Sequence, residues 1–87
     1  MDTRSKIVTA EEADERIAVW LAAGDQVDRF TGTFDPLLAP DIERLEQSAR
    51  PGARLVVYMV DPVRPILSRH DRCQLVAALR RVDLVVG

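Results

Sequence analysis

Apolar positions recur along this chain either every three to four residues or in short continuous runs, and together they predict alternating helices and strands. The first helical stripe contains Ala13, Ile17, Trp20 and Leu21. It follows Thr9, which begins a capping-box pattern, and it precedes Gly24, which favours the left-handed conformation of a helix stop. We therefore expect a helix between Thr9 and Gly24.

Three short runs have the composition of strands. Residues 53–60 are apolar on both faces and lie between turn residues, which indicates a strand at the centre of a parallel sheet. Residues 82–86 form a second apolar run. Residues 26–31 predict a weaker strand, because Asp28 and Arg29 interrupt it and charges commonly defend an exposed edge. We expect one side of this strand to be open.

Two further helices separate the three runs. Pro40 fits the first position of a helix that ends before Pro51, and Ser68 begins a cap pattern for a helix that buries Cys73. Right-handed crossovers then place the strands in the order 3-2-1, with the two connecting helices on one face and the N-terminal helix on the other. The whole chain, residues 1–87, is expected to form a single α/β domain.

Charge and cysteine content limit the classes of function. The net charge is −2 with both signs interleaved, so no basic surface for nucleic acid or an anionic membrane is expected. The single cysteine, Cys73, excludes an internal disulfide and a cysteine-based metal cluster, and it fits a reducing compartment. No apolar run is long enough to span a bilayer. We expect a cytoplasmic protein.

The turn-rich segment from Thr31 to Asp41 is the candidate site, because it joins the first predicted strand to the following helix. In parallel α/β units, ligands bind where a strand ends and a helix begins, since backbone N–H groups and the helix N-terminus hold phosphate oxygens there. A glycine turn alone is weak evidence for such a site. Whether this segment is predicted to bind phosphate therefore depends on the residues that follow Gly32.

Much of the chain matches one known pattern. The matching stretches are Lys6 to Thr9, Gly32 to Asp35, Leu45-Glu46, Gly52 to Val57, Arg64 to Ile66, Asp71-Arg72, Ala77 to Arg80 and Val82-Asp83. Together they resemble the cytidylyltransferase-like nucleotidyltransferase family, most closely the adenylyltransferase domain of bacterial ADP-heptose synthases. The resemblance implies a Rossmann-like three-layer half-domain, in which an N-terminal helix precedes βαβαβ and a three-stranded parallel sheet.

The resemblance also implies a reaction whose machinery is incomplete here. The family joins a nucleoside triphosphate to a sugar or alcohol phosphate, releases pyrophosphate, and carries a Gly-x-Phe-Asp-x-x-His-x-Gly-His signature. The positions for His, Gly and His are held here by Leu38, Pro40 and Asp41. Leucine donates no hydrogen bond and aspartate repels a triphosphate, so the cationic stabilisation of transfer is lost. No catalytic residue is assigned.

Two further parts of the family pattern have no counterpart. A lysine that reaches the phosphates belongs to a longer loop after the second strand, whereas Asp61 here runs almost directly into Arg64. The second half of the family's domain would lie beyond Gly87. The resemblance therefore predicts the N-terminal half of a degenerate nucleotidyltransferase domain, with Asp28 and Arg29 acting as an edge guard or as part of a dimer contact.

Three functions remain open from the sequence. The leading hypothesis is an inactive or severely impaired nucleotidyltransferase-like protein, a pseudoenzyme that forms a homodimer or binds a partner protein. The second is an active nucleotidyltransferase that a partner chain completes, and the third is a nucleotide-binding module without turnover. In the last two cases Mg²⁺ with ATP or CTP would bind, with no other cofactor or metal. The candidate nucleotide-binding residues are Thr31, Gly32, Thr33, Phe34 and Asp35.

Each of these features also has a purely structural interpretation. The glycine turn fits a tight corner, and Asp41 fits the first turn of a helix as a partner of its dipole. His70 fits a surface position and Cys73 a small buried side chain. The arginines at positions 64, 69, 72, 80 and 81 predict either an anion site or charges on loops and helix ends.

Overall fold

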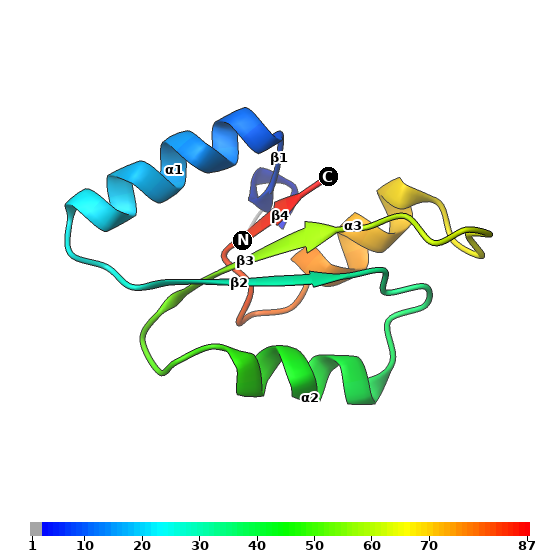
Figure 1. Cartoon of the computed structure of the whole chain (residues 1–87). Coiled ribbons are helices and arrows are strands. Elements are labelled where there is room, and N and C mark those ends of the chain that lie inside the picture. The colour runs from blue at the N-terminus through cyan, green and yellow to red at the C-terminus, as the bar shows by residue number, and fades with distance from the viewer. Residues whose placement is uncertain (1–2) are drawn as a thin grey trace.

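The computed structural model describes residues 3–87 and shows three helices packed on the two faces of a parallel sheet (Figure 1). In chain order the elements are a short 3-10 helix η1 (Thr3–Lys6), β1 (Ile7–Val8), α1 (Ala10–Ala22), β2 (Val27–Gly32), α2 (Ala39–Ser48), β3 (Arg54–Met59), α3 (Arg69–Ala77) and β4 (Leu84–Val86).

The sheet has four strands, in the order β1-β4-β3-β2. The prediction of a three-stranded sheet was therefore wrong, although the three predicted strands keep their order as β4-β3-β2. The additional strand, β1, contains only two residues, and a run of this length shows no periodicity. Ile7 pairs with Val85 and Val8 with Val86, so α1 becomes the crossover that connects the two edges of the sheet.

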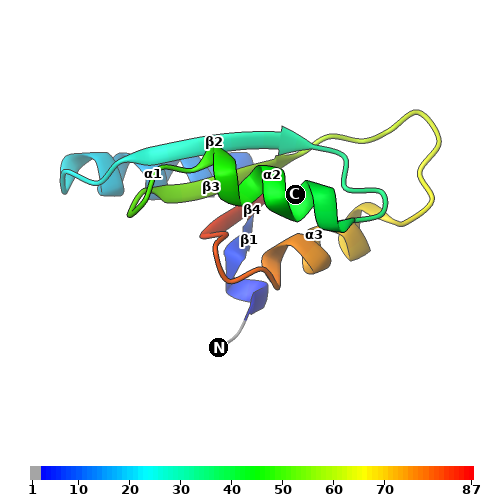
Figure 2. The same ribbon diagram turned by 90° about the horizontal axis from the view of Figure 1, so that it is seen from below.

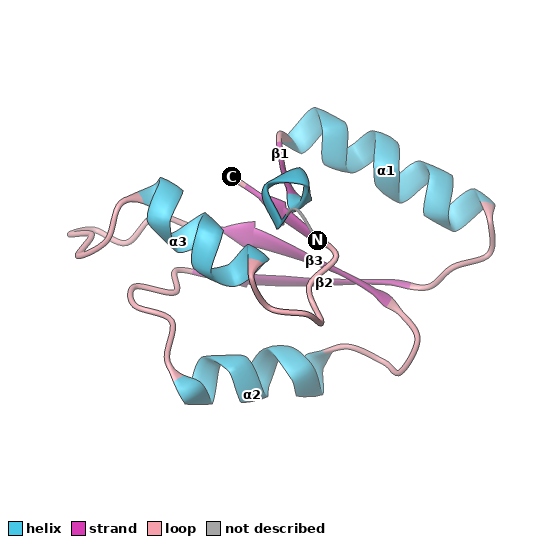
Figure 3. Cartoon of the chain, turned by 180° about the vertical axis from the view of Figure 1, so that it is seen from behind, coloured by secondary structure: helices cyan, strands magenta, loops and turns pink. Residues whose placement is uncertain are grey.

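The helices divide between the faces of the sheet as predicted. On one face, Ala13 and Ile17 of α1 pack against Val56 and Leu84. On the other face, the core contains buried residues of α2 and α3 together with alternate residues of the same strands; it includes Leu45, Val76, Val57 and Val85. Figures 1 and 3 show α1 and α2 on opposite sides of the sheet.

The central strand is β3, where Leu55, Val56 and Val57 are completely buried. An apolar run on both faces is what a parallel sheet covered by helices requires. The strand is also fixed at its start, because the Asp83 carboxylate accepts the Leu55 N–H at 2.7 Å. The prediction of a central strand from residues 53–60 is confirmed.

Local signals in the sequence set the helix ends. The Thr9 hydroxyl accepts the Glu12 N–H at 3.2 Å, and the Ser68 hydroxyl accepts the Asp71 N–H at 3.0 Å. Each cap satisfies a backbone donor that the first turn of a helix leaves free. Gly24 follows α1 with φ of +90°, a conformation that favours glycine. All three predicted helix signals are confirmed.

The strand β2 lies at the edge of the sheet and pairs only with β3 among the described elements. Figure 2 shows it along the margin of the molecule. Of its two charged residues, Asp28 accepts both the backbone N–H and the guanidinium of Arg50 at 2.8 Å, which lowers the pKa of Asp28. Asp28 is therefore bound to the segment after α2, and Arg29 is the exposed charge of the strand.

Candidate functional site at the carboxyl end of the sheet

Two loops meet at the carboxyl end of the sheet: residues 33–38 after β2 and residues 60–68 after β3. The carboxylate of Asp35 joins them, since it accepts the N–H groups of Ile66 and Leu67, both at 2.7 Å. The Ile66 bond, with that of Leu67, holds the pKa of Asp35 below its usual value. Asp35 thus uses its oxygens within the protein.

The buried guanidinium of Arg72 binds the same two loops through their carbonyl oxygens. Its side chain is 1% exposed and donates to the carbonyl oxygens of Thr33 at 3.1 Å, Val60 at 3.2 Å and Leu67 at 3.3 Å. It also donates to Asp61 at 2.8 Å. A planar group with several donors can satisfy such a set of acceptors at once, which a lysine cannot.

Asp61 is the counter-ion of this arrangement. Arg72 and then Arg69, which donates at 2.7 Å, lower the pKa of the Asp61 carboxyl. Arg69 donates in addition to the Met59 carbonyl at the end of β3. Two of the five arginines that could have formed an anion site are therefore occupied by Asp61 and by backbone carbonyls.

Packing explains why a glycine occupies position 32 in this corner. A Cβ atom at Gly32 would lie 2.7 Å from the Phe34 ring, which is closer than non-bonded carbon atoms approach. The ring belongs to the core, with 5% of the residue exposed, and its centroid lies 6.1 Å from that of Phe30. Phe34 itself has a φ of +49°, a strained conformation for a residue with a side chain. The glycine thus makes room for the aromatic ring.

A cavity of about 320 Å³ opens beside this corner. Its lining residues come from the end of β2, the loop that follows and the start of α2, namely Phe30, Thr31, Gly32, Thr33, Phe34, Asp35, Pro36, Asp41 and Arg44. All five candidate nucleotide-binding residues lie in this lining. Of the three positions where the signature is broken, Asp41 lines the cavity.

Asp41 occupies the N-terminus of α2. Its carboxylate accepts the N–H of Leu38 at 2.9 Å and forms an ion pair with Arg44. The predicted structural role of Asp41, as a partner of the helix dipole, agrees with this contact. Leu38 precedes the helix with an exposed side chain, and Pro40 lies in its first turn. The end of the helix is therefore closed by a carboxylate of the protein itself.

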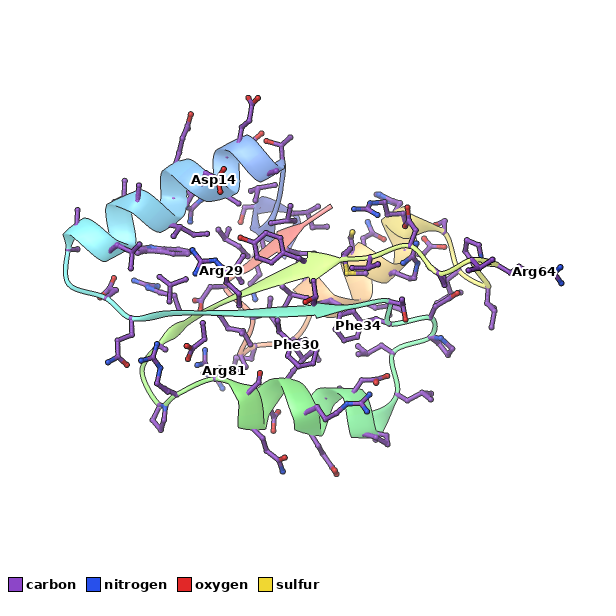
Figure 4. All side chains as sticks on the ribbon, viewed as in Figure 1. Asp14, Arg29, Phe30, Phe34, Arg64 and Arg81 are labelled. Carbon is purple, nitrogen blue, oxygen red and sulfur yellow. The ribbon has the colours of Figure 1, made fainter. Side chains whose placement is uncertain are left out.

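The remaining predicted charges lie away from the cavity. Arg64 extends from the tip of the 60–68 loop (Figure 4), and His70 is exposed on α3. Arg80 and Arg81 line two other cavities near the amino end of the strands, where Arg81 contacts Asp83 at 3.7 Å. The five arginines are not gathered at one place, and those other than Arg72 lie on loops or at the start of α3, which agrees with the interpretation as charges on loops and helix ends.

Arg72 is the residue of the corner whose role the sequence did not reveal. It was counted among the loop and helix-end charges, yet it is buried. The available signal was its spacing, because Arg72 lies beside Cys73 and four residues before Val76 on the buried side of α3. Cys73 is buried as predicted, and burial raises the pKa of its thiol.

Residues 3–87 contain no group of three or more His, Cys, Asp or Glu side chains placed to hold a metal ion. None of the helices among them has the length and apolarity that crossing a membrane requires.

Together, the parallel sheet and the helices on both of its faces define a Rossmann-like α/β domain. The chain is similar to curated proteins named Bifunctional protein HldE. It is 38% identical over 90 residues to that of Magnetococcus marinus, 36% over 89 residues to that of Azorhizobium caulinodans, and 32% over 95 residues to that of Gluconobacter oxydans.

These matches cover 92–99% of this chain but only 18–20% of the three proteins, so the chain spans about a fifth of their length. No established family profile matches it. The resemblance to bacterial ADP-heptose synthases that was predicted from the motifs is confirmed. The nucleotide-binding role of residues 31–35 stays a prediction.

Proposed function

We propose that this chain is a nucleotidyltransferase-like domain without transferase activity of its own. The observation that carries the proposal is the closed N-terminus of α2, where Asp41 accepts the Leu38 N–H and pairs with Arg44. A free helix N-terminus holds phosphate through its N–H groups and its dipole. Here a carboxylate occupies that place, and it repels an incoming phosphate.

The charges around the cavity support the same conclusion. The cation in its lining, Arg44, is paired with Asp41, and the nearby Arg72 is buried and bound to Asp61. Phosphoryl and nucleotidyl transfer depend on cations and donors that stabilise the charge developing on the phosphate. The described residues supply no unpaired cation to the lining of this cavity.

Mg²⁺ with a nucleoside triphosphate does not fit this corner either. The metal ion needs oxygen ligands, and the candidate carboxylates are Asp35 and Asp41. Asp35 accepts two backbone N–H groups, and Asp41 accepts one and pairs with Arg44. A metal ion at this place would have to displace contacts that hold the loops together.

The test measures nucleotide binding and pyrophosphate release. The natural chain is titrated with ATP and CTP by calorimetry, and pyrophosphate is assayed with Mg²⁺ and a set of sugar phosphates. We expect no binding heat and no release above a blank without protein. Release by the natural chain alone would overturn the proposal.

A matched variant tests the reason for the inactivity. Leu38→His, Pro40→Gly and Asp41→His together restore the signature that the resemblance implies. We expect this variant to bind ATP more tightly than the natural chain, because it removes the carboxylate and adds two imidazoles. Equal affinity of the two chains would show that the helix end does not limit binding.

A second candidate function is nucleotide binding without turnover, and the cavity of about 320 Å³ beside Phe30 and Phe34 favours it. Aromatic rings and backbone groups bind a base or ribose without help from cations. This candidate predicts a binding heat with adenosine or cytidine that phosphates do not strengthen. The same calorimetric series, extended to nucleosides, separates it from the leading proposal.

The proposal includes self-association, supported by the edge strand β2, which has one ladder partner among the described elements. An unpaired edge is a template for pairing with another chain. We also propose a cytoplasmic location, since the single cysteine is buried and free, as is usual in a reducing compartment.

A further inference from the structure

We propose that two copies of this chain pair edge to edge through β2, antiparallel and in a register centred on Phe30. This inference rests on the self-association included in the proposed function, and it adds which strand makes the contact and in which register. The result is one continuous sheet of two subunits, in which each β2 pairs with the other along the edge that has no partner among residues 3–87.

The hydrogen-bonding groups of the free edge follow from those on the paired side. The Gln26 carbonyl accepts from Arg54 at 2.8 Å, and the Gly32 carbonyl accepts from Val60 at 2.9 Å. Backbone groups of successive strand residues point to alternate sides. The N–H and C=O groups of Val27, Arg29 and Thr31 therefore point away from β3, toward the open edge.

Little defends this edge against pairing. The strand Val27–Gly32 contains no proline, and its ladder with β3 is continuous from Val27 to Gly32. Asp28 is held by Arg50 at 2.8 Å, so its charge is compensated within the subunit. Arg29 is the exposed charge, and Figure 4 shows its side chain on the α1 side of the strand, with Phe30 on the α2 side.

The charge of Arg29 selects the register. Two-fold antiparallel pairings that overlap most of the strand are centred on Arg29 or on Phe30. The first places Arg29 directly opposite Arg29 of the partner subunit, and like charges in that position are destabilising. The second places Arg29 opposite Thr31 of the partner subunit, so no like charges face one another.

The register centred on Phe30 also satisfies the backbone. Arg29 and Thr31 both carry outward groups, and opposite residues of this kind exchange N–H and C=O bonds in an antiparallel ladder. Phe30 then lies opposite Phe30 of the partner subunit on the α2 side, and aromatic cross-strand pairs stabilise a sheet. Phe30 and Thr31 also line the corner cavity, so the partner strand lies against one side of it.

The first experiment removes one outward donor. Thr31→Pro deletes an N–H that points to the open edge and leaves the β2–β3 ladder intact, while Thr31→Val keeps that N–H. By size-exclusion chromatography with light scattering, we expect the natural chain and Thr31→Val to have twice the chain mass. We expect Thr31→Pro to have the mass of one chain and an unchanged far-ultraviolet circular dichroism spectrum. A natural chain that stays monomeric over a wide concentration range overturns the proposal.

The second experiment tests the register and does not depend on how well Thr31→Pro folds. The cysteine variants all keep Arg29, whose charge selects the register: Phe30→Cys is oxidised alone, and Val27→Cys and Thr31→Cys are oxidised as a mixture. Residues that lie opposite one another in an antiparallel ladder are within disulfide reach, and mass spectrometry identifies the disulfides. The register centred on Phe30 predicts a disulfide between two Phe30→Cys chains and none between Val27→Cys and Thr31→Cys. A disulfide in the mixture, or none between two Phe30→Cys chains, overturns the register. The native Cys73 is 3% exposed and is present in every sample.

The two proposals fail in different ways. The mass measurements use no nucleotide, and the pyrophosphate assay does not depend on the mass. A dimer that releases pyrophosphate would overturn the proposed inactivity and would be compatible with the edge contact. A monomer that releases none would overturn the edge contact and would be compatible with the inactivity.

Discussion

At the scale of single residues, Arg72 holds the corner together. Its guanidinium is buried and donates to three carbonyl oxygens and to Asp61. In Arg72→Met the carbonyls of two loops lose their donor, and each buried acceptor left unpaired costs about 1–3 kcal/mol. We expect the free energy of unfolding to fall by more than about 2 kcal/mol, which for a domain of this size lowers the Tm by roughly 10 °C or more.

The matched control is Arg80→Met, which removes the same charge from an exposed position shortly after α3. We expect its Tm to stay within about 2 °C of the natural chain, because exposed substitutions away from special contacts change stability little. Urea unfolding followed by circular dichroism measures both variants. Equal losses for Arg72→Met and Arg80→Met would contradict the role of the buried guanidinium.

Residues of the corner also show where sequence reasoning reached its limit. Gly32 was recognised as a turn residue, but its reason is the Phe34 ring, which lies next to the place of the missing Cβ atom. Arg72 was one of five arginines interpreted as an anion site or as charges on loops and helix ends; its burial was not expected, since charged side chains are rarely buried. The role of Arg72 depends on contacts with residues as distant in the sequence as Thr33, and the role of Gly32 depends on where the Phe34 ring lies in the folded corner. Composition and periodicity contain neither.

At the scale of elements, the N-terminus of α2 allows a test of the proposal that the Asp41 carboxylate keeps phosphate away from the helix end. Asp41→Ala removes the carboxylate that accepts the Leu38 N–H. Losing such a contact in the first turn costs about 1 kcal/mol, so we expect a lower Tm. The freed Leu38 N–H and the positive end of the helix dipole then attract anions, and we expect added pyrophosphate to raise the Tm of Asp41→Ala but not that of the natural chain.

Asp14→Ala is the control for this experiment, because it removes an exposed carboxylate from α1 (Figure 4). If pyrophosphate raised the Tm of both variants equally, the effect would come from net charge and not from the helix end.

The elements themselves were largely readable from the sequence. Helix signals at Thr9, Ser68 and Gly24 act locally, and the apolar run of β3 reports its burial on both faces, so these predictions are confirmed. The strand β1 was missed, because two residues carry no pattern and its position depends on pairing with β4 far along the chain. The number of strands is thus a property of the tertiary structure.

At the scale of the whole molecule, carboxylates hold both ends of the sheet, Asp28 and Asp83 near the amino end and Asp35 at the carboxyl end. At the carboxyl end, Asp35, Asp61 and Arg72 fix two loops in the geometry of a ligand corner. The same contacts engage both carboxylates and the guanidinium within the protein. They are part of the support for the proposal that the domain has no transferase activity of its own.

These carboxylates make the stability of the domain depend on acid. The pKa values of Asp28, Asp35 and Asp61 are lowered below the ordinary value of 3.8, chiefly by Arg50, by the Ile66 N–H and by Arg72 respectively. A lowered pKa in the folded state contributes stability that is present above the unfolded value and is lost as the pH falls through the folded value. We expect the free energy of unfolding to be level near neutrality and to decrease below about pH 4.

The variant Asp35→Asn separates one of these contributions. It keeps the shape of the side chain but replaces an ionised acceptor of two N–H groups with a neutral amide. Urea unfolding at a series of pH values should show the largest difference from the natural chain near neutrality, and the two curves should converge as the pH falls below about 4. Asp14→Asn, in an exposed position on α1, should follow the natural curve at every pH. A constant difference between Asp35→Asn and the natural chain across the whole range would mean that Asp35 acts through packing, with no contribution from its charge.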